Sequence, residues 1–280
     1  MPNNTYCYSF GGVSFRLEAP DFKESEKLSL FRIENTACDC LYTLSLEDEL
    51  KAPEGTLLTK AGYEAFYKTQ SGIVRAFYDE KHDSRLILTD AESPSLHRIL
   101  FRRDSTDYFS TNLILKLLNI PRQIIDFGGV FLHSSFIAYQ GKAILFTGQK
   151  QIGKSTQAAL WKAHRGAEIV NGDRTLIRKT EGEYRAFGSP YCGTSDICLK
   201  RELPLSAVVI LSQGEANTVR PASIRESFAA MLDGSTFDTW DKQKTASAAT
   251  ICGDIAAEVP FYHLTCTPDE NAVKALEEIL

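Results

Sequence analysis

Long apolar runs are missing from this sequence, and so is an excess of basic residues. The longest strongly apolar stretches fall far short of the roughly 20 residues that span a bilayer. The N-terminal residues also lack the basic start and the apolar stretch that are typical of a secretory signal. The formal net charge is −5. Because nucleic-acid phosphates need clustered Lys and Arg, this balance argues against non-specific nucleic-acid binding. We expect a cytoplasmic protein whose partners include neither a membrane nor nucleic acid.

The cysteines do not form a recognisable pattern. There are seven, an odd number at irregular spacings, which is not typical of a disulfide framework. Cys38 and Cys40 lie close together, but no second Cys or His pair is near them in sequence, so a zinc site is not expected. We expect reduced thiols that pack as small apolar side chains.

At 280 residues the chain has room for one large domain or two smaller ones. Gly11-Gly12 separates two strand-like runs and predicts a hairpin. Apolar residues at helical spacing from Ser110 to Leu118, ended by Pro121, indicate the connection to a second domain. We expect a mostly-β domain over residues 1–118, with a structural or acceptor-docking role and with strands at Tyr6–Phe10, Val13–Leu17, Leu28–Ile33, Leu41–Leu46, Gly72–Tyr78 and Arg85–Leu88.

Residues 119–280 alternate between apolar strand-like runs and helical segments, which is typical of an α/β domain. The expected strands are Val130–Leu132, Phe136–Tyr139, Ala143–Thr147, Glu168–Val170, Thr175–Lys179, Tyr184–Phe187, Ala207–Leu211 and Phe261–Cys266. The expected helices are Ser155–His164, Ile224–Leu232, Lys244–Ala257 and Glu270–Leu280.

Residues Gly148–Thr156, here called the glycine loop, begin with a match to G-x-x-x-x-G-K-[ST] that has no mismatch. The two glycines allow a tight turn that brings backbone N–H groups against phosphate oxygens. Lys154 supplies a compact positive charge for the β- and γ-phosphates, and the Ser155 hydroxyl is suited to ligand Mg²⁺. The pattern predicts a site for the triphosphate of a nucleotide, ATP with Mg²⁺.

The context of the loop makes this prediction more specific. A short buried strand, Ala143–Thr147, precedes it, and a segment rich in helix formers follows, so the helix N-terminus faces the anion. A glycine-rich turn without a ligand is the alternative. We expect the nucleotide to be held by Gly148, Gln149, Ile152, Gly153, Lys154, Ser155 and Thr156.

Phosphoryl transfer also needs a carboxylate near the metal, and Asp173 is the candidate. It follows the expected strand Glu168–Val170, so the carboxylate would come from the element adjoining the loop strand. The alternative is a turn residue in Asn171-Gly172-Asp173. His133 ends an apolar run ahead of the loop strand, and it is either a catalytic group or a core histidine.

The sequence at this point resembles the kinase domain of HPr kinase/phosphorylase, which shares a phosphate-binding core with phosphoenolpyruvate carboxykinase. Phe131–Ser135, Gly141–Phe146, the glycine loop and Arg165–Asp173 carry the likeness, over about residues 129–212. The last third also resembles HPr-kinase-like proteins of bacterial peptide-modification clusters. The resemblance implies an α/β P-loop kinase core over 119–280, with His133, Lys154 and Asp173 as catalytic residues and Ser155 and Asp173 as metal ligands.

Two departures from that family matter. Thr156 stands where the family usually carries Glu, and Gly172 replaces the first acid of its pair, which takes the proton from the acceptor hydroxyl. His133 could take that role, or Asp173 could serve both metal and proton. Because a loose transition state needs little base assistance, the loss of the acid need not abolish transfer. A loop of small residues, Ser189–Ser195, could approach the nucleotide or the acceptor, or be an ordinary surface loop.

These observations favour a serine kinase that moves the γ-phosphoryl of ATP to a Ser or Thr hydroxyl on a small protein or peptide. The missing acid keeps open a non-catalytic ATP-binding regulatory module, and a small-molecule kinase is a further alternative. A dinucleotide oxidoreductase is not expected, because no G-x-G-x-x-G follows a strand. The family resemblance also makes a homo-oligomer an expectation.

Overall fold

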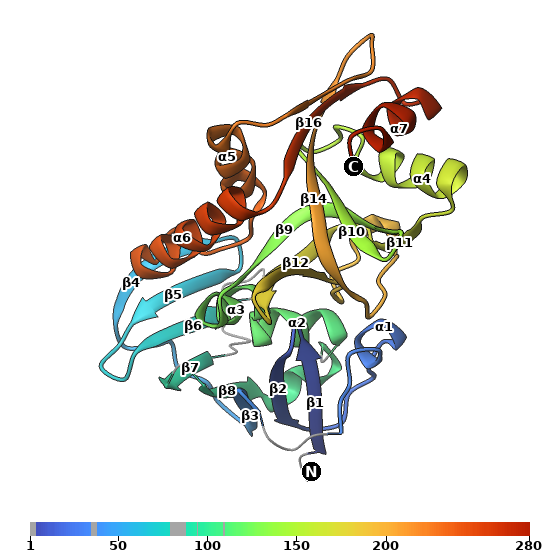
Figure 1. Ribbon diagram of the computed structural model, residues 1–280. Coiled ribbons are helices and arrows are strands. Elements are labelled where there is room, and N and C mark those ends of the chain that lie inside the picture. The colour runs from blue at the N-terminus through green and yellow to red at the C-terminus, as the bar shows by residue number, and fades with distance from the viewer. Residues whose placement is uncertain (1–3, 35–37, 79–87, 94, 109) are drawn as a thin grey trace. The chain divides into compact units, whose positions relative to one another are not determined.

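The computed structural model describes residues 4–34, 38–78, 88–93, 95–108 and 110–280. The chain divides into two compact units, Met1–Gln123 and Ile124–Leu280 (Figure 1). Both contain helices and an eight-stranded sheet, so the fold is mixed α/β.

The sheet of the first unit has the order β1-β2-β3-β8-β7-β6-β5-β4. The predicted hairpin is confirmed, because Phe10 pairs with Val13 and both glycines between them have positive φ. Alternate residues of β1 and β2 are buried, and Tyr8 and Phe15 are fully so. The strands are β1 Asn4–Phe10, β2 Val13–Ala19, β3 Cys40–Glu47, β4 Thr56–Ala61, β5 Glu64–Lys68, β6 Ile73–Phe77, β7 Leu88–Ser93 and β8 Leu96–Arg102.

One predicted strand of this unit, Leu28–Ile33, is wrong. The segment begins as a short helix, α1 Glu26–Ser29, because the Ser25 hydroxyl accepts a hydrogen bond from the Leu28 N–H and caps the helix. The expected strand Arg85–Leu88 lies outside the described residues except for Leu88, which begins β7.

The first unit ends with helical segments. Ser110 caps α2 Thr111–Leu118 by accepting from the Leu113 N–H, and Asn119 ends it in the left-handed conformation. The Tyr42 hydroxyl donates to the Leu118 carbonyl at 2.6 Å, which ties this helix end to β3. The other segments are η1 Arg103–Tyr108 and α3 Ile120–Ile124.

The second unit contains the sheet order β10-β9-β12-β13-β14-β16-β15, with β11 paired to β9. A parallel pairing of β10 with β14 closes a circuit through β9, β12 and β13. The strands are β9 Gly129–Tyr139, β10 Lys142–Thr147, β11 Glu168–Asn171, β12 Arg174–Thr180, β13 Glu183–Phe187, β14 Glu202–Gln213, β15 Thr218–Pro221 and β16 Phe261–Cys266. The helices are η2 Ile125–Phe127, α4 Lys154–Arg165, η3 Gly193–Ser195, α5 Ile224–Gly234, α6 Lys242–Glu258 and α7 Glu270–Glu277.

The two strands expected at Val130–Leu132 and Phe136–Tyr139 are one continuous strand, β9. The polar pair Ser134-Ser135 suggested a break, but both residues are fully buried within the strand. Ser134 is compatible with burial because its hydroxyl donates to the Thr175 hydroxyl of β12 at 2.9 Å.

Helices cover both faces of this sheet. Figure 1 shows α4 and α7 on one side and α5 and α6 on the other. Because side chains of a strand alternate between faces, Leu145 of β10 packs into the cluster that contains Met231 and Cys252, whereas Phe146 packs with Trp161 and Val273. The strand that leads into the glycine loop is thus anchored on both faces.

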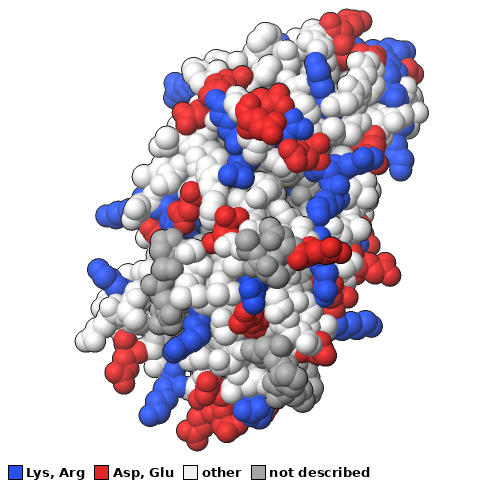
Figure 2. Space-filling view, turned by 60° about the horizontal axis from the view of Figure 1, so that its bottom comes forward, with Lys and Arg blue, Asp and Glu red and all other residues white. Residues whose placement is uncertain are grey.

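Charged side chains of both signs are mixed among uncharged ones on the face shown in Figure 2. In the part of the chain that the structure describes, no helix combines the length and the apolar character needed to cross a membrane.

Trp161 is the largest fully buried side chain, and its contacts hold α4 against the sheet. We expect Trp161→Ala to lower the free energy of unfolding of the second unit by about 3–5 kcal/mol, because it removes apolar contacts and leaves a cavity. Lys162→Ala, which changes the exposed next residue, should stay within about 0.5 kcal/mol. Urea unfolding of both variants measures the difference, and equal losses would contradict this role of Trp161.

Candidate functional site

Strand β9 brings three segments of the candidate site together. On one side Ser134 pairs with Thr147, the last residue before the glycine loop. On the other side His133 pairs with Arg174, the first residue of β12, and the Ser134 N–H donates to the Asp173 carbonyl at 3.0 Å. Asp173 therefore does not come from a strand that adjoins β10, because β9 lies between them.

A turn between β11 and β12 holds Asp173 in place. Asn171 is fully buried, and its side-chain oxygen accepts from the backbone N–H groups of Asp173 and Arg174 at 2.9 and 2.8 Å. Its amide nitrogen donates to the carbonyls of Ser189 and Tyr191. Asn171 was not among the predicted site residues, although the Asn-Gly turn signal pointed to this position.

His133 and Asp173 form a hydrogen-bonded pair. The imidazole Nδ1 lies 3.0 Å from the Asp173 carbonyl and 3.1 Å from its carboxylate Oδ1. Since both neighbours are acceptors, Nδ1 carries the hydrogen, and in the neutral ring Nε2 is then the acceptor. The hydrogen bond from His133 lowers the pKa of Asp173 against the opposing effect of burial, and the charges of Arg174 and Lys154 add to it. Asp173 is thus an ionised carboxylate at neutral pH.

The glycine loop has the backbone conformation that its glycines allow. Gly148 and Gly153 have φ of 140° and 114°, and Gln151 between them is also left-handed at 66°. Gly153 is the N-cap of α4 and offers no side chain to the helix, so the first N–H groups of α4 lack a side-chain cap. A twelve-residue helix that begins in this way presents its positive end to an anion.

Lys154 is bound to the loop that precedes it. Its ammonium donates to the carbonyls of Gly148 and Gln149, both at 3.0 Å, and the residue is 8% exposed. Burial lowers its pKa, and the nearby Asp173 carboxylate acts in the opposite direction. Ser155 and Thr156, in the first turn of the helix, are exposed. A cation at the loop, two exposed hydroxyls and an ionised carboxylate are therefore set around the N-terminus of α4.

A cleft of about 630 Å³ opens beside the glycine loop. Of the predicted site residues, His133, Gly148, Gln149 and Ile152 line it, whereas Gly153, Lys154, Ser155, Thr156 and Asp173 are not among its lining residues. The sequence did not indicate the remaining walls. They come from the end of β14, from the middle of β16 and from one face of α5, including Ser212, His263, Glu226 and Asp233.

At Gly172, where the resemblance noted in the sequence predicts an acid, the space for a side chain is filled. A Cβ at Gly172 would lie 2.0 Å from the Ser195 Oγ and 2.5 Å from its Cβ. Ser195 is held there by a hydrogen bond from its hydroxyl to the Cys192 carbonyl at 2.7 Å. A Cβ at Gly193 would collide with Asp173 at 2.8 Å. The small-residue loop predicted at Ser189–Ser195 thus packs directly against the turn that carries Asp173.

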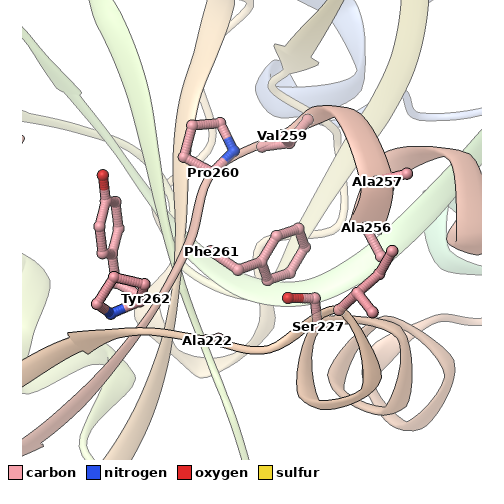
Figure 3. Close-up of a pocket in the computed structure, with 10 residues that line it drawn as sticks. Ala222, Ser227, Ala256, Ala257, Val259, Pro260, Phe261 and Tyr262 are labelled. Atoms are coloured by element: carbon pink, nitrogen blue, oxygen red, sulfur yellow. The ribbon is translucent and has the colours of Figure 1, made fainter.

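A second hollow, shown in Figure 3, lies among α5, the end of α6 and the start of β16. Its volume is about 360 Å³, and none of the described residues that line it is charged. Ser227 contributes a hydroxyl to its lining, whereas the Tyr262 hydroxyl points away and donates to the Ile279 carbonyl at 3.4 Å. The residues that line this hollow offer no charged group to neutralise a phosphate. The cleft beside the glycine loop, which has charged groups around it, is therefore the candidate site.

Among the described residues, no three His, Cys, Asp or Glu side chains gather in a way that could hold a metal ion. Ser155 and Asp173 stay the predicted metal ligands at the glycine loop.

A model of the SynChlorMet cassette protein ScmC family matches residues 100–280, which is more than half of the chain. The chain belongs to the ScmC family. The match includes the glycine loop, His133 and Asp173, so the site described above lies within the part that defines the family.

Among solved structures, the chain is similar to the Hpr(Ser) kinase/phosphatase from Coxiella burnetii, with 13% sequence identity and a TM-score of 0.33. The match covers 53% of this chain and 94% of the other. A likeness this weak carries no structural argument. A comparison with curated proteins finds no match.

The contact between Gly172 and Ser195 leads to a prediction. Gly172→Asp should lower the free energy of unfolding by about 1–3 kcal/mol, because its side chain overlaps Ser195. The double variant Gly172→Asp/Ser195→Gly should recover most of that loss. Urea unfolding of both variants and of Ser195→Gly alone tests this, and a Gly172→Asp protein as stable as the wild type would show that the loop yields easily.

Proposed function

We propose that this protein is an ATP-dependent phosphotransferase that moves the γ-phosphoryl group to a Ser or Thr hydroxyl of a small protein or peptide. The observation that carries the proposal is the position of Lys154. This residue is buried, and its ammonium is hydrogen-bonded to the glycine loop. The loop leads directly into the N-terminus of α4, which has no side-chain cap. Those three features together neutralise a triphosphate.

The residues around the loop fit a magnesium ion. Ser155 offers an exposed hydroxyl, and the hydrogen bond from His133 keeps Asp173 ionised, so both present the oxygen ligands that Mg²⁺ prefers. When bound, the ion would neutralise charge on the transferring phosphoryl group.

His133 acts on the phosphate side of the site. Its Nδ1–H fixes the orientation of Asp173, and its ring lines the cleft in which the acceptor hydroxyl would approach. Because transfer passes through a loose transition state, positioning and charge neutralisation account for most of the acceleration. We further propose that residues 1–118 help to dock the acceptor and that the protein acts in the cytoplasm, where ATP is available.

The filled position at Gly172 favours a second candidate, a non-catalytic module that binds ATP and signals to a partner. In that case the glycine loop would bind the nucleotide but the acceptor hydroxyl would find no proton acceptor. Both candidates bind ATP, but only the phosphotransferase moves the γ-phosphoryl group to an acceptor.

The test incubates the protein with γ-labelled ATP, Mg²⁺ and the small proteins and peptides encoded beside its gene. We expect labelled Ser or Thr, and we expect Lys154→Ala to weaken ATP binding by about 10- to 100-fold because a charged donor is lost. The matched control is Lys162→Ala, an exposed lysine two turns further along the same helix.

Three results are decisive. Transfer by the wild type and by Lys162→Ala, but not by Lys154→Ala, supports the phosphotransferase. Tight binding in calorimetry without transfer to any acceptor or to water supports the module. No heat from ATP at millimolar Mg²⁺ contradicts both.

A further inference from the structure

One face of α5 lines the cleft beside the glycine loop. Its members, Glu226, Ala229, Ala230 and Asp233, recur at helical spacing. Two alanines occupy the middle of this face and a carboxylate stands at each end. The small side chains in the middle of this face leave room in the cleft, and both ends of the face are acidic.

Contacts with β9 fix the end of α5 that carries Asp233. A Cβ at Gly234 would lie 2.7 Å from a methyl carbon of Leu132 and 3.2 Å from the Thr147 hydroxyl. Ser235 then forms an isolated antiparallel β-bridge with Leu132, and the Thr236 N–H donates to the Phe131 carbonyl at 2.9 Å. Asp233 is thus held next to the place where β10 passes into the glycine loop.

The two carboxylates of this face differ in their partners. Glu226 closes the capping box of α5 with Ser223 and pairs with Arg220. Asp233 is exposed, and its carboxylate forms no hydrogen bond or ion pair with another side chain among the residues that the structure describes. It also lies in the last turn of α5, which has no basic residue, so the negative end of the helix dipole disfavours its charge.

Three groups near the loop bear on the choice of base. Ser195 occupies the space at Gly172, so no carboxylate reaches the cleft from that position. Asp173 accepts from the Nδ1–H of His133 and serves the metal side of the proposed site, so the ring nitrogen of His133 that stays open is Nε2. The proton of an acceptor hydroxyl can then pass to this Nε2 or to a carboxylate on another wall of the cleft, and protein kinases use a carboxylate for this step.

We propose that Asp233 is that proton acceptor, an inference that rests on the proposed phosphotransferase function. The acceptor oxygen forms a bond to the γ-phosphorus while the bond from that phosphorus to the β–γ bridging oxygen breaks. The hydroxyl proton passes to the Asp233 carboxylate, and ADP leaves with the electron pair of the broken bond. Asp233 is then a catalytic residue supplied by α5, in place of the acid missing from the β11–β12 turn.

The test measures label transfer from γ-labelled ATP by the full chain and by Asp233→Ala, to whichever acceptor the wild type labels. We expect the rate to fall by about 100-fold, the lower end of what general-base catalysis contributes. The affinity for ATP with Mg²⁺, measured by calorimetry, should stay within about twofold, because Asp233 does not touch the nucleotide in this proposal. Added formate should restore part of the rate, since the cleft is open to a small carboxylate.

Two further variants complete the design. Asp233→Asn keeps the shape of the side chain and should be as slow as Asp233→Ala. Asp254→Asn changes an exposed aspartate of α6 that does not line the cleft, and it should transfer at the wild-type rate. Thermal unfolding should show Asp233→Asn to be at least as stable as the wild type, because the charge at the helix end is gone.

The outcomes separate this inference from the proposed function. Wild-type transfer with unimpaired Asp233→Ala and Asp233→Asn variants would overturn the role of Asp233 and leave the phosphotransferase standing. A slow Asp233→Ala variant that formate does not rescue would also overturn it. A wild type that binds ATP but labels no acceptor would remove both proposals.

Discussion

The hydrogen bonding of β9 on both of its edges is the constraint on which the candidate site depends. This one strand holds Thr147 against one edge and the β11–β12 turn against the other, with His133 and Ser134 between them. Because each pairing fixes a register, a shift of one residue would move His133 to the other face of the sheet and away from Asp173. The strand pairings bring the charged groups together, and the Asn171 turn and the glycine loop then hold Asp173 and Lys154 in place.

The parts of the site that depend on local sequence could be predicted. The glycine loop, the strand before it and the helix after it follow from a nine-residue pattern and its neighbours, and the structure has β10 and α4 there. The hairpin at Gly11-Gly12 is equally local. In both cases the backbone conformation follows from residues that are adjacent in the chain.

The parts that depend on tertiary contacts could not be predicted. Ser134-Ser135 looked like the end of a strand, and only the partner hydroxyl of Thr175 explains how Ser134 is buried within one. The family resemblance drew attention to Gly172, but the sequence did not show that Ser195 fills the space beside it. Asp233 lies in no motif, and only the packing of α5 against the end of β10 brings it to the cleft.

The closed circuit of strands has a consequence for association between molecules. β9, β10, β12, β13 and β14 each pair with neighbours within the circuit, so their backbone groups are engaged, and β15 is left as the terminal strand of the path. β15 is only four residues long, ends in Pro221 and carries Arg220. A short edge strand with a proline and a charged side chain offers few backbone groups to a strand of another molecule. The architecture that aligns the site also discourages intermolecular sheet growth at that border.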